Sequence, residues 1–132
     1  MIVADANILV YRLVPSSRSQ DAMALAQFDA EWAAPVLWRS EVRNALAGYL
    51  RAGRLSNREA ETAMELGAAC LLGGEHLVSD QAVFDLVSQS RCSAYDCEYV
   101  ALAQALATIL VTEDQALLRA FPKHCRSIAQ VI

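Results

Sequence analysis

The chain is poor in the residues that mark disordered, fibrous or membrane-embedded proteins. Its 132 residues include only 5 glycines and 3 prolines, and 55% of them are hydrophobic against 20% charged. This composition excludes intrinsic disorder, collagen-like repeats and low-complexity tracts. No apolar run reaches the roughly 18 residues that a transmembrane helix needs. We therefore expect one globular domain over residues 1–132 and no membrane partner.

The sequence also lacks the usual cysteine and histidine sites. Its cysteines match no zinc spacing and no C-x-x-C pair, so we interpret them as apolar core residues. The two histidines, His76 and His124, belong to no metal-binding motif. The start of the chain meets an acid at Asp5 after a short apolar stretch, unlike a secretory signal peptide. This pattern predicts a cytoplasmic protein.

Positive charge is scarce and unevenly placed. The net charge is −4, yet residues 1–58 carry seven arginines against five acids, whereas residues 59–132 carry four basic residues against ten acids. A locally basic surface therefore remains available to a polyanion, for which local fields matter more than net charge.

Short apolar segments alternate with segments of helical periodicity. Strands are expected over residues 2–5, 31–34, 77–78, 108–112 and 127–131. Helices are expected over residues 8–14, 19–29, 36–52, 56–72, 82–90 and 93–107, with a further short helix up to residue 120. This alternation predicts an α/β fold of three layers, α/β/α, with a short, mostly parallel sheet of four or five strands and about seven helices.

Two acids follow expected strands. Asp5 ends the first strand, and Asp114 follows the apolar run 109–111. The carboxyl ends of parallel strands lie along one edge of a sheet, where open α/β folds bind ligands, so both acids are candidates for one site. Asp80 competes by the same logic, although the helical pattern just beyond it favours an N-cap. A helix N-cap is also an equally good interpretation of Asp114.

Two more acids lie on expected helices. Asp96 shares a helical face with Tyr99 and with the apolar residues that continue its stripe. A buried lone carboxylate is costly unless it is paired or binds a cation. Ser93, three residues earlier, makes a capping box an equally weighted alternative for Asp96. Glu41 lies at the edge of the apolar stripe over 36–52, where a lone acid is more often solvated. Four carboxylates at one place would suit Mg²⁺ or Mn²⁺, because hard cations take oxygen ligands.

At this point the chain resembles the PIN-domain family, and within it the VapC-type toxins of bacterial toxin–antitoxin pairs. Four segments carry the resemblance, and their order and spacing follow the family over nearly the whole chain. They are VADANILVY from Val3, WRSEVRNAL from Trp38, SAYDCEYVALA from Ser93 and LVTEDQALL from Leu110.

The resemblance implies a metal-dependent endoribonuclease that cuts RNA and is neutralised by a VapB-type antitoxin. It places the acids that hold Mg²⁺, or Mn²⁺, on Asp5, Glu41, Asp96 and Asp114. A metal-activated water would attack the phosphorus in line and leave a 5′-phosphate. Family members are usually homodimers. The supporting polar positions of the family fall on Asn7 and Thr112.

One departure from the family pattern concerns the fourth acid. Glu113 stands where these toxins often have a small residue, so it competes with Asp114, which the family spacing favours. Candidates to guide RNA phosphates are Arg12, Arg39 and Arg43, although a solvated helix face is the favoured interpretation of each.

Three other functions are compatible with parts of the pattern. A phosphoryl-transfer protein would need a lysine near the strand ends, and the only lysine is Lys123, beyond the last expected helix. A non-catalytic PIN-fold binding module would usually have lost its acids. A nuclease of the same fold acting on DNA stays open, because both nucleic acids are phosphodiesters.

Overall fold

Five short parallel strands form the centre of the molecule, in the order β3-β2-β1-β4-β5. The computed structural model describes all residues from Met1 to Ile132. Every residue of β1, β2 and β4 is buried, because helices cover both faces of the sheet. The strands are β1 (Ile2–Ala4), β2 (Trp32–Pro35), β3 (Glu75–His76), β4 (Leu110–Val111) and β5 (Cys125–Arg126).

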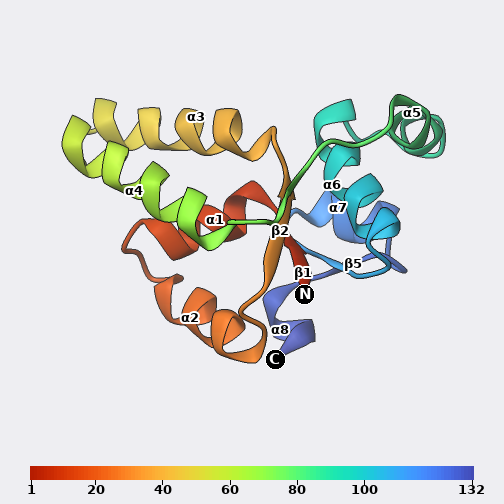
Figure 1. Ribbon diagram of the computed structural model, residues 1–132, viewed down its shortest axis with the longest axis horizontal. Coiled ribbons are helices and arrows are strands. Elements are labelled where there is room, and N and C mark those ends of the chain that lie inside the picture. Colours follow the sequence, from red (N-terminus) through yellow and green to blue (C-terminus); the bar gives the residue numbers. More distant parts are fainter.

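Eight helices surround this sheet, one more than the sequence indicated. Figure 1 shows α1 to α4 on one side of the sheet and α5 to α7 on the other, so the predicted three-layer α/β arrangement is confirmed. The helices are α1 (Ala6–Leu13), α2 (Ser19–Phe28), α3 (Trp38–Arg51), α4 (Asn57–Cys70), α5 (Asp80–Ser88), α6 (Ala94–Ala105), α7 (Gln115–Ala120) and α8 (Ile128–Val131).

The order of the strands reverses at β1. The chain first travels from β1 through β2 to β3, and then returns to place β4 and β5 on the other side of β1. Crossover connections between parallel strands are right-handed, so the connecting helices must change faces when the direction of travel changes. The point between β1 and β4 is therefore the switch point of the sheet, where folds of this type bind ligands at the carboxyl ends of the strands.

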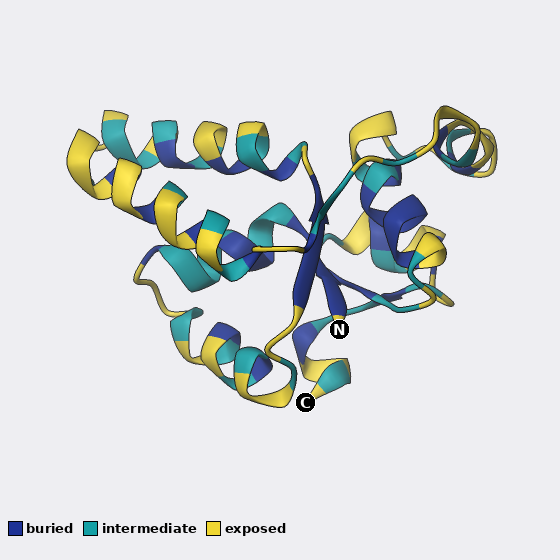
Figure 2. Cartoon of the chain, viewed as in Figure 1, coloured by how far each residue is buried: buried dark blue, intermediate teal, exposed yellow.

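One contiguous core of 30 buried residues joins the sheet to its helices. Figure 2 shows this burial along the strands and the inward faces of the helices, with exposed residues on the outer faces of α3 and α4. Cys97 and Cys125 are buried in this core as expected, whereas Cys70 and Cys92 are only half-buried. No helix is long and apolar enough to cross a membrane.

Two predicted strands are corrected by the structure. The segment 127–131 forms α8 and not a strand, because the side chains of Ser127 and Gln130 cap each other's backbone N–H groups. The last strand precedes it and pairs with β4. The strand predicted at residues 77–78 lies two residues earlier as β3, which pairs with the end of β2. Leu77 is 88% exposed and follows the strand.

Candidate functional site

The four predicted carboxylates each lie at the start of a helix, on the side of the sheet where the strands end. Asp5 directly follows β1 and caps α1, and Asp114 follows β4 and caps α7. Glu41 lies in the first turn of α3 and Asp96 in the first turn of α6. The unpaired N–H groups of a helix N-terminus carry partial positive charge, which stabilises acids there. In Figure 1 this edge is the upper end of the strands, between α3 and α6.

Asp5 is the most deeply placed of the four, with an exposed fraction of 6%. Its Oδ1 accepts a hydrogen bond from the Ala6 N–H at 2.8 Å, and its Oδ2 accepts one from the Thr112 hydroxyl at 2.6 Å. The pKa of Asp5 is raised to about 6 despite these two bonds, chiefly by burial and in smaller part by the charges of Glu41 and Asp96. The Asp5 carboxylate is therefore fixed in orientation and lies within the electrostatic field of two other acids.

Glu41 reaches the same region from α3. Its Oε1 atom is buried and has no hydrogen-bond partner, and the same is true of the Tyr99 hydroxyl. Burial raises the pKa of Glu41, the Tyr99 hydroxyl opposes this increase, and the charge of Asp96 adds to it. The two groups thus face each other without a closed hydrogen bond. The sequence placed Tyr99 on the face of Asp96, but gave its hydroxyl no role.

Asp96 is not the second half of a capping box. The Ser93 hydroxyl accepts the Asp96 N–H at 3.1 Å, but no return bond from the Ser93 N–H to the Asp96 carboxylate forms. In α4, by contrast, Ser56 and Glu59 complete both bonds. The Asp96 carboxylate therefore does not cap the backbone of its own helix. Burial raises its pKa, and the charge of Asp114 raises it further.

Asp114 both caps a helix and lies near another of the predicted acids, so the structure agrees with each of the two roles considered from the sequence. Its Oδ1 accepts the N–H groups of Ala116 and Leu117 at 2.8 and 3.2 Å, so it is the N-cap of α7. It also lies near enough to Asp96 to raise the pKa of that acid. Its own N–H donates to the hydroxyl of Thr112 at 3.0 Å. Thr112 therefore links the acid after β1 to the acid after β4.

Glu113 faces a different part of the molecule. Its Oε1 accepts the N–H of Ile128 at the start of α8 at 2.9 Å and lies 3.5 Å from the guanidinium of Arg18. Its backbone N–H donates to Asn7 Oδ1 at 3.4 Å, which ties α1 to the loop after β4. Glu113 thus binds the start of α8. Of the two neighbouring acids, Asp114 is the one that lies near Asp96.

The donor set of this edge suits a hard divalent cation, although the acids are not drawn together. No three side chains among the Asp, Glu, His and Cys residues lie in an arrangement that could hold a metal ion. Mutual repulsion of the carboxylates adds to the effect of burial on their raised pKa values. The buried, unpartnered Oε1 of Glu41 and an all-oxygen donor set fit Mg²⁺ or Mn²⁺, whose charge would cancel that repulsion.

A cavity of about 570 Å³ opens beside these acids, between the first turns of α1, α3 and α6. Glu41 lines it, and so does Ala6, the residue that follows Asp5. The remaining lining residues are Leu37, Ser40, Asn44 and Tyr95. The site therefore has an adjoining space with both apolar and polar walls.

Two of the arginines expected to guide RNA are occupied elsewhere. The guanidinium of Arg12 stacks over the ring of Trp32 at 4.4 Å, and Trp32 begins β2 at the opposite end of the sheet. Arg39 donates two hydrogen bonds to the carboxylate of Glu75, at 2.9 and 2.7 Å. Both guanidinium groups have intramolecular partners, and the RNA contacts expected of these two side chains stay a prediction.

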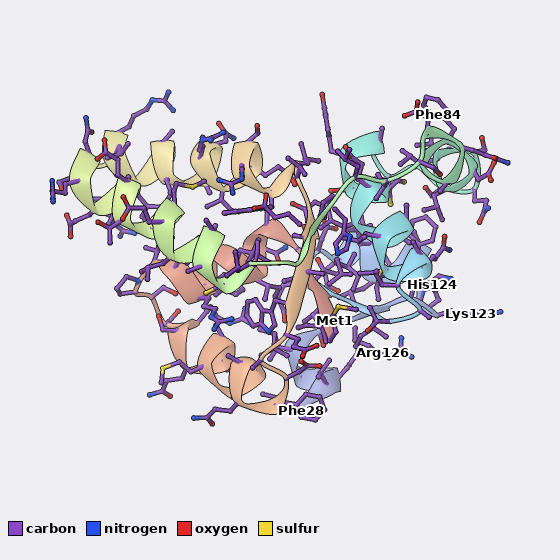
Figure 3. The ribbon with its side chains drawn as sticks, in the orientation of Figure 1. Met1, Phe28, Phe84, Lys123, His124 and Arg126 are labelled. Carbon is purple, nitrogen blue, oxygen red and sulfur yellow. The ribbon has the colours of Figure 1, made fainter.

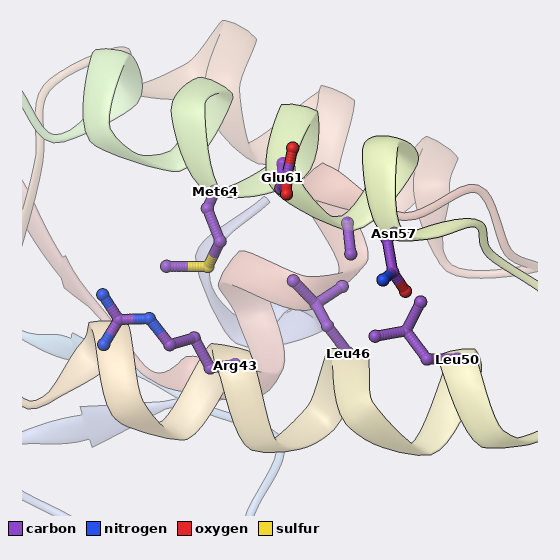
Figure 4. A pocket seen from close by; sticks show the side chains of 7 residues that line it. Arg43, Leu46, Leu50, Asn57, Glu61 and Met64 are labelled. Carbon is purple, nitrogen blue, oxygen red and sulfur yellow. The ribbon is translucent and has the colours of Figure 1, made fainter.

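Arg43 differs from them, because it is exposed and forms no ion pair in the structure. It lines a second cavity, of about 330 Å³, between α3 and α4. Figure 4 shows Arg43 and Met64 at one end of this cavity, with Leu50 and Asn57 at the other. The cavity is separate from the one that Glu41 lines, so the RNA contact of Arg43 stays a prediction.

The alternative site residues lie away from the four acids. Asp80 is exposed in the first turn of α5, whose N-cap is Ser79 and not Asp80. Lys123 lies before β5, at the amino end of the sheet, and Figure 3 shows it beside His124 on that side of the molecule. A lysine at that end cannot reach Asp5, which removes the phosphoryl-transfer arrangement considered from the sequence.

Comparison with known proteins gives the class to which this fold belongs. No protein-family model and no curated protein matches the sequence. Among solved structures, FitAcB from Neisseria gonorrhoeae superposes with a TM-score of 0.74 over 98% of this chain and 99% of that one, at 14% identity. PAE2754 from Pyrobaculum aerophilum gives 0.74 over 97% and 90%, at 19% identity. A toxin–antitoxin complex from Klebsiella pneumoniae gives 0.66 over 97% and 98%, at 18% identity. The chain therefore has the fold of these proteins, which confirms the PIN-type fold expected from the sequence.

Proposed function

We propose that this chain is a metal-dependent endoribonuclease and the toxin of a type II toxin–antitoxin pair. The observation that carries the proposal is that Asp5, Glu41 and Asp96 lie along the same edge of the sheet, at the start of α1, α3 and α6, where their charges influence one another's pKa values. Each of the three has a raised pKa to which burial contributes most; the charge of Asp96 also raises the pKa values of Asp5 and Glu41, and the charge of Asp114 raises that of Asp96. One buried and two half-buried acids along the same edge are costly without a cation, which supports a site that binds one.

The chain's own residues would divide the work of such a site. Asp5, with both oxygens held by hydrogen bonds, supplies a carboxylate whose direction is fixed before any ligand arrives. Glu41 and Asp96 would supply the other oxygens from α3 and α6, and Asp114 would contribute from the cap of α7. Mg²⁺ or Mn²⁺, when bound, supplies Lewis-acid stabilisation of the charge that builds on a phosphodiester. Thr112 would keep the two strand-end acids in register, because its hydroxyl bonds to both residues.

The partners follow from the same proposal. The similarity to a toxin–antitoxin complex supports a VapB-type antitoxin as the neutralising partner. The 330 Å³ cavity between α3 and α4, which Arg43 lines, is a candidate surface for that antitoxin or for a second copy in a homodimer. Coexpression with the product of a neighbouring small gene, followed by copurification, tests the antitoxin.

The direct test is cleavage of a total RNA pool by the purified chain, with Mg²⁺, with Mn²⁺ and with EDTA. Asp96→Asn should lower cleavage by at least about 100-fold, because even residues that only support a metal ligand cost about 10- to 100-fold when replaced. Asp85→Asn, an exposed acid on α5, is the matched control and should cleave like the wild type.

Each outcome of this test decides between functions. Discrete products that require metal and disappear in Asp96→Asn support the ribonuclease. Folded protein that cuts single-stranded DNA but not RNA would assign the same chemistry to DNA. Folded protein that cuts neither would leave a binding module with the PIN fold. Cleavage at the wild-type rate by Asp96→Asn would show that the acids are not the reacting site.

A further inference from the structure

An exposed aromatic ring stands beside the carboxylates. Tyr95 is the second residue of α6, next to Asp96 in the chain, and has an exposed fraction of 62%. Single exposed aromatic residues are common on protein surfaces and need no explanation by themselves. Tyr95 differs because it lines the 570 Å³ cavity that Glu41 also lines. Phe84, on α5, is as exposed at 64% but does not line this cavity, and Figure 3 shows it at the far edge of the molecule.

The α3 side of this cavity carries hydrogen-bonding groups. Ser40 and Asn44 are exposed residues on one face of α3, one helical turn apart, and both line the cavity. An amide and a hydroxyl offer both donors and acceptors, which suits the edge of a flat heteroaromatic ring. The volume lies within the range of about 300 to 1,000 Å³ that small-molecule pockets occupy. The cavity thus combines a flat aromatic wall, a polar wall and a border with the acids.

We propose that this cavity is a nucleobase subsite, in which the Tyr95 ring stacks on an unpaired base of single-stranded RNA next to the phosphate that is cut. The inference rests on the proposed ribonuclease function and specifies the form of RNA that the site takes. Stacking on an aromatic side chain needs a free π-face, and neighbouring bases cover that face in a duplex. A loop, a bulge or an unpaired end is therefore the substrate, and Asn44 and Ser40 contact the edge of the stacked base.

Binding of a labelled RNA without turnover tests the subsite. The probe is a fluorescein-labelled single strand of about 12 nucleotides, alone or annealed to its complement, with the protein held in EDTA and binding followed by anisotropy. Tyr95→Ala should weaken binding of the single strand by about fivefold or more, as loss of one base–aromatic stack predicts. Tyr95→Phe keeps the ring and should stay within about twofold of the wild type. Phe84→Ala is the control for loss of an exposed ring and should bind as the wild type does.

Salt dependence and kinetics separate stacking from other causes. Tyr95 carries no charge, so Tyr95→Ala should leave the slope of log Kd against log salt unchanged while it shifts the affinity. With Mg²⁺ added, the variant should raise KM and retain most of kcat, because Tyr95 contacts the base and not the reacting phosphate.

The outcomes distinguish the subsite from the nuclease. In one outcome the wild type binds RNA and cuts it with metal, while Tyr95→Ala binds RNA with the same affinity. That result would overturn the subsite but not the ribonuclease. Duplex RNA bound and cut as well as the single strand would also overturn it. A wild-type chain that neither binds nor cuts RNA would overturn the proposed function, and the subsite would fall with it.

Discussion

Asp5→Asn tests the electrostatic cost that the site imposes on the fold. Asp5 has a pKa raised from 3.8 to about 6, chiefly because it is buried. The ionised form is therefore less stable in the folded chain than in the unfolded chain. Asparagine keeps the shape and the N-cap role of aspartate, since both residues are equally good caps, but it carries no charge. The variant should consequently be more stable than the wild type when no metal is present.

The magnitude follows from the pKa difference. A shift of about 2 pKa units corresponds to about 3 kcal/mol of stability lost at pH 7, at about 1.4 kcal/mol per unit. Replacing one carboxylate oxygen by an amide nitrogen disturbs the bond from the Thr112 hydroxyl, which costs about 1 kcal/mol. Asp5→Asn should therefore raise the free energy of unfolding by about 2 kcal/mol at pH 7 in EDTA.

The sign of the pH dependence is fixed by the same numbers. The folded pKa lies above the unfolded one, so the contribution of Asp5 to stability is greatest below pH 3.8 and is lost as the pH rises through 6. The advantage of Asp5→Asn should accordingly appear between about pH 4 and 6 and stay constant above that range. Urea unfolding at several pH values, with Asp85→Asn as the exposed control, measures this difference.

Magnesium should reverse the order of stability. A cation at about 100 times its Kd adds about 2.7 kcal/mol to a protein that binds it, which exceeds the advantage of the uncharged variant. The wild type should then unfold at a higher urea concentration than Asp5→Asn. An Asp5→Asn variant that is less stable than the wild type in EDTA by the same amount at every pH would refute the reasoning, because Asp5 would then act only as a hydrogen-bond acceptor.

Three further variants test the surroundings of the site by urea unfolding. Gly67→Ala should lower the free energy of unfolding by about 1 to 3 kcal/mol, because a Cβ there would lie 2.8 Å from ring carbons of the buried Trp38. Its matched control, Gly48→Ala in α3, meets no atom within 4 Å and should raise stability by about 0.5 to 1 kcal/mol. Tyr99→Phe should raise the pKa of Glu41 further, because the Tyr99 hydroxyl is the group that lowers it, so the metal-free variant should lose stability relative to the wild type as the pH rises through that pKa. Glu113→Ala should cost about 1 kcal/mol through loss of its bond to α8 while RNA cleavage persists, and loss of cleavage would instead make this residue the fourth acid.

The sequence predicted which acids lie along one edge of the sheet better than it predicted the outer strands. Asp5 and Asp114 were found because each follows an apolar run, and the parallel sheet then brings such residues to one edge. The pairing of β1 with β4 decides that these two acids are neighbours, and it depends on contacts more than a hundred residues apart. The last two elements were confused because each spans only a few residues, so their apolar periodicity was too short to identify a strand or a helix.

The arginines show a different limit. Arg12 and Arg39 each have a partner twenty or more residues away, in Trp32 and Glu75. Local periodicity places an arginine on a helix face but does not show what lies opposite that face. Both residues therefore looked like free cations in the sequence, whereas the fold uses them to join a helix to a strand.

The acids raise the question of how a structural cap is distinguished from a ligand when both occupy the first turn of a helix. Ser56 and Ser93 each cap a helix and have an acid three residues later, yet only Glu59 returns a bond to the backbone of its serine. Aspartate is one methylene shorter than glutamate, and Asp96 does not make that return bond here. Its carboxylate consequently remains available to face Asp5 and Glu41. An aspartate where a capping box expects glutamate, on a face that is otherwise apolar, is thus a signal in the sequence for a half-buried acid that does not cap its own helix.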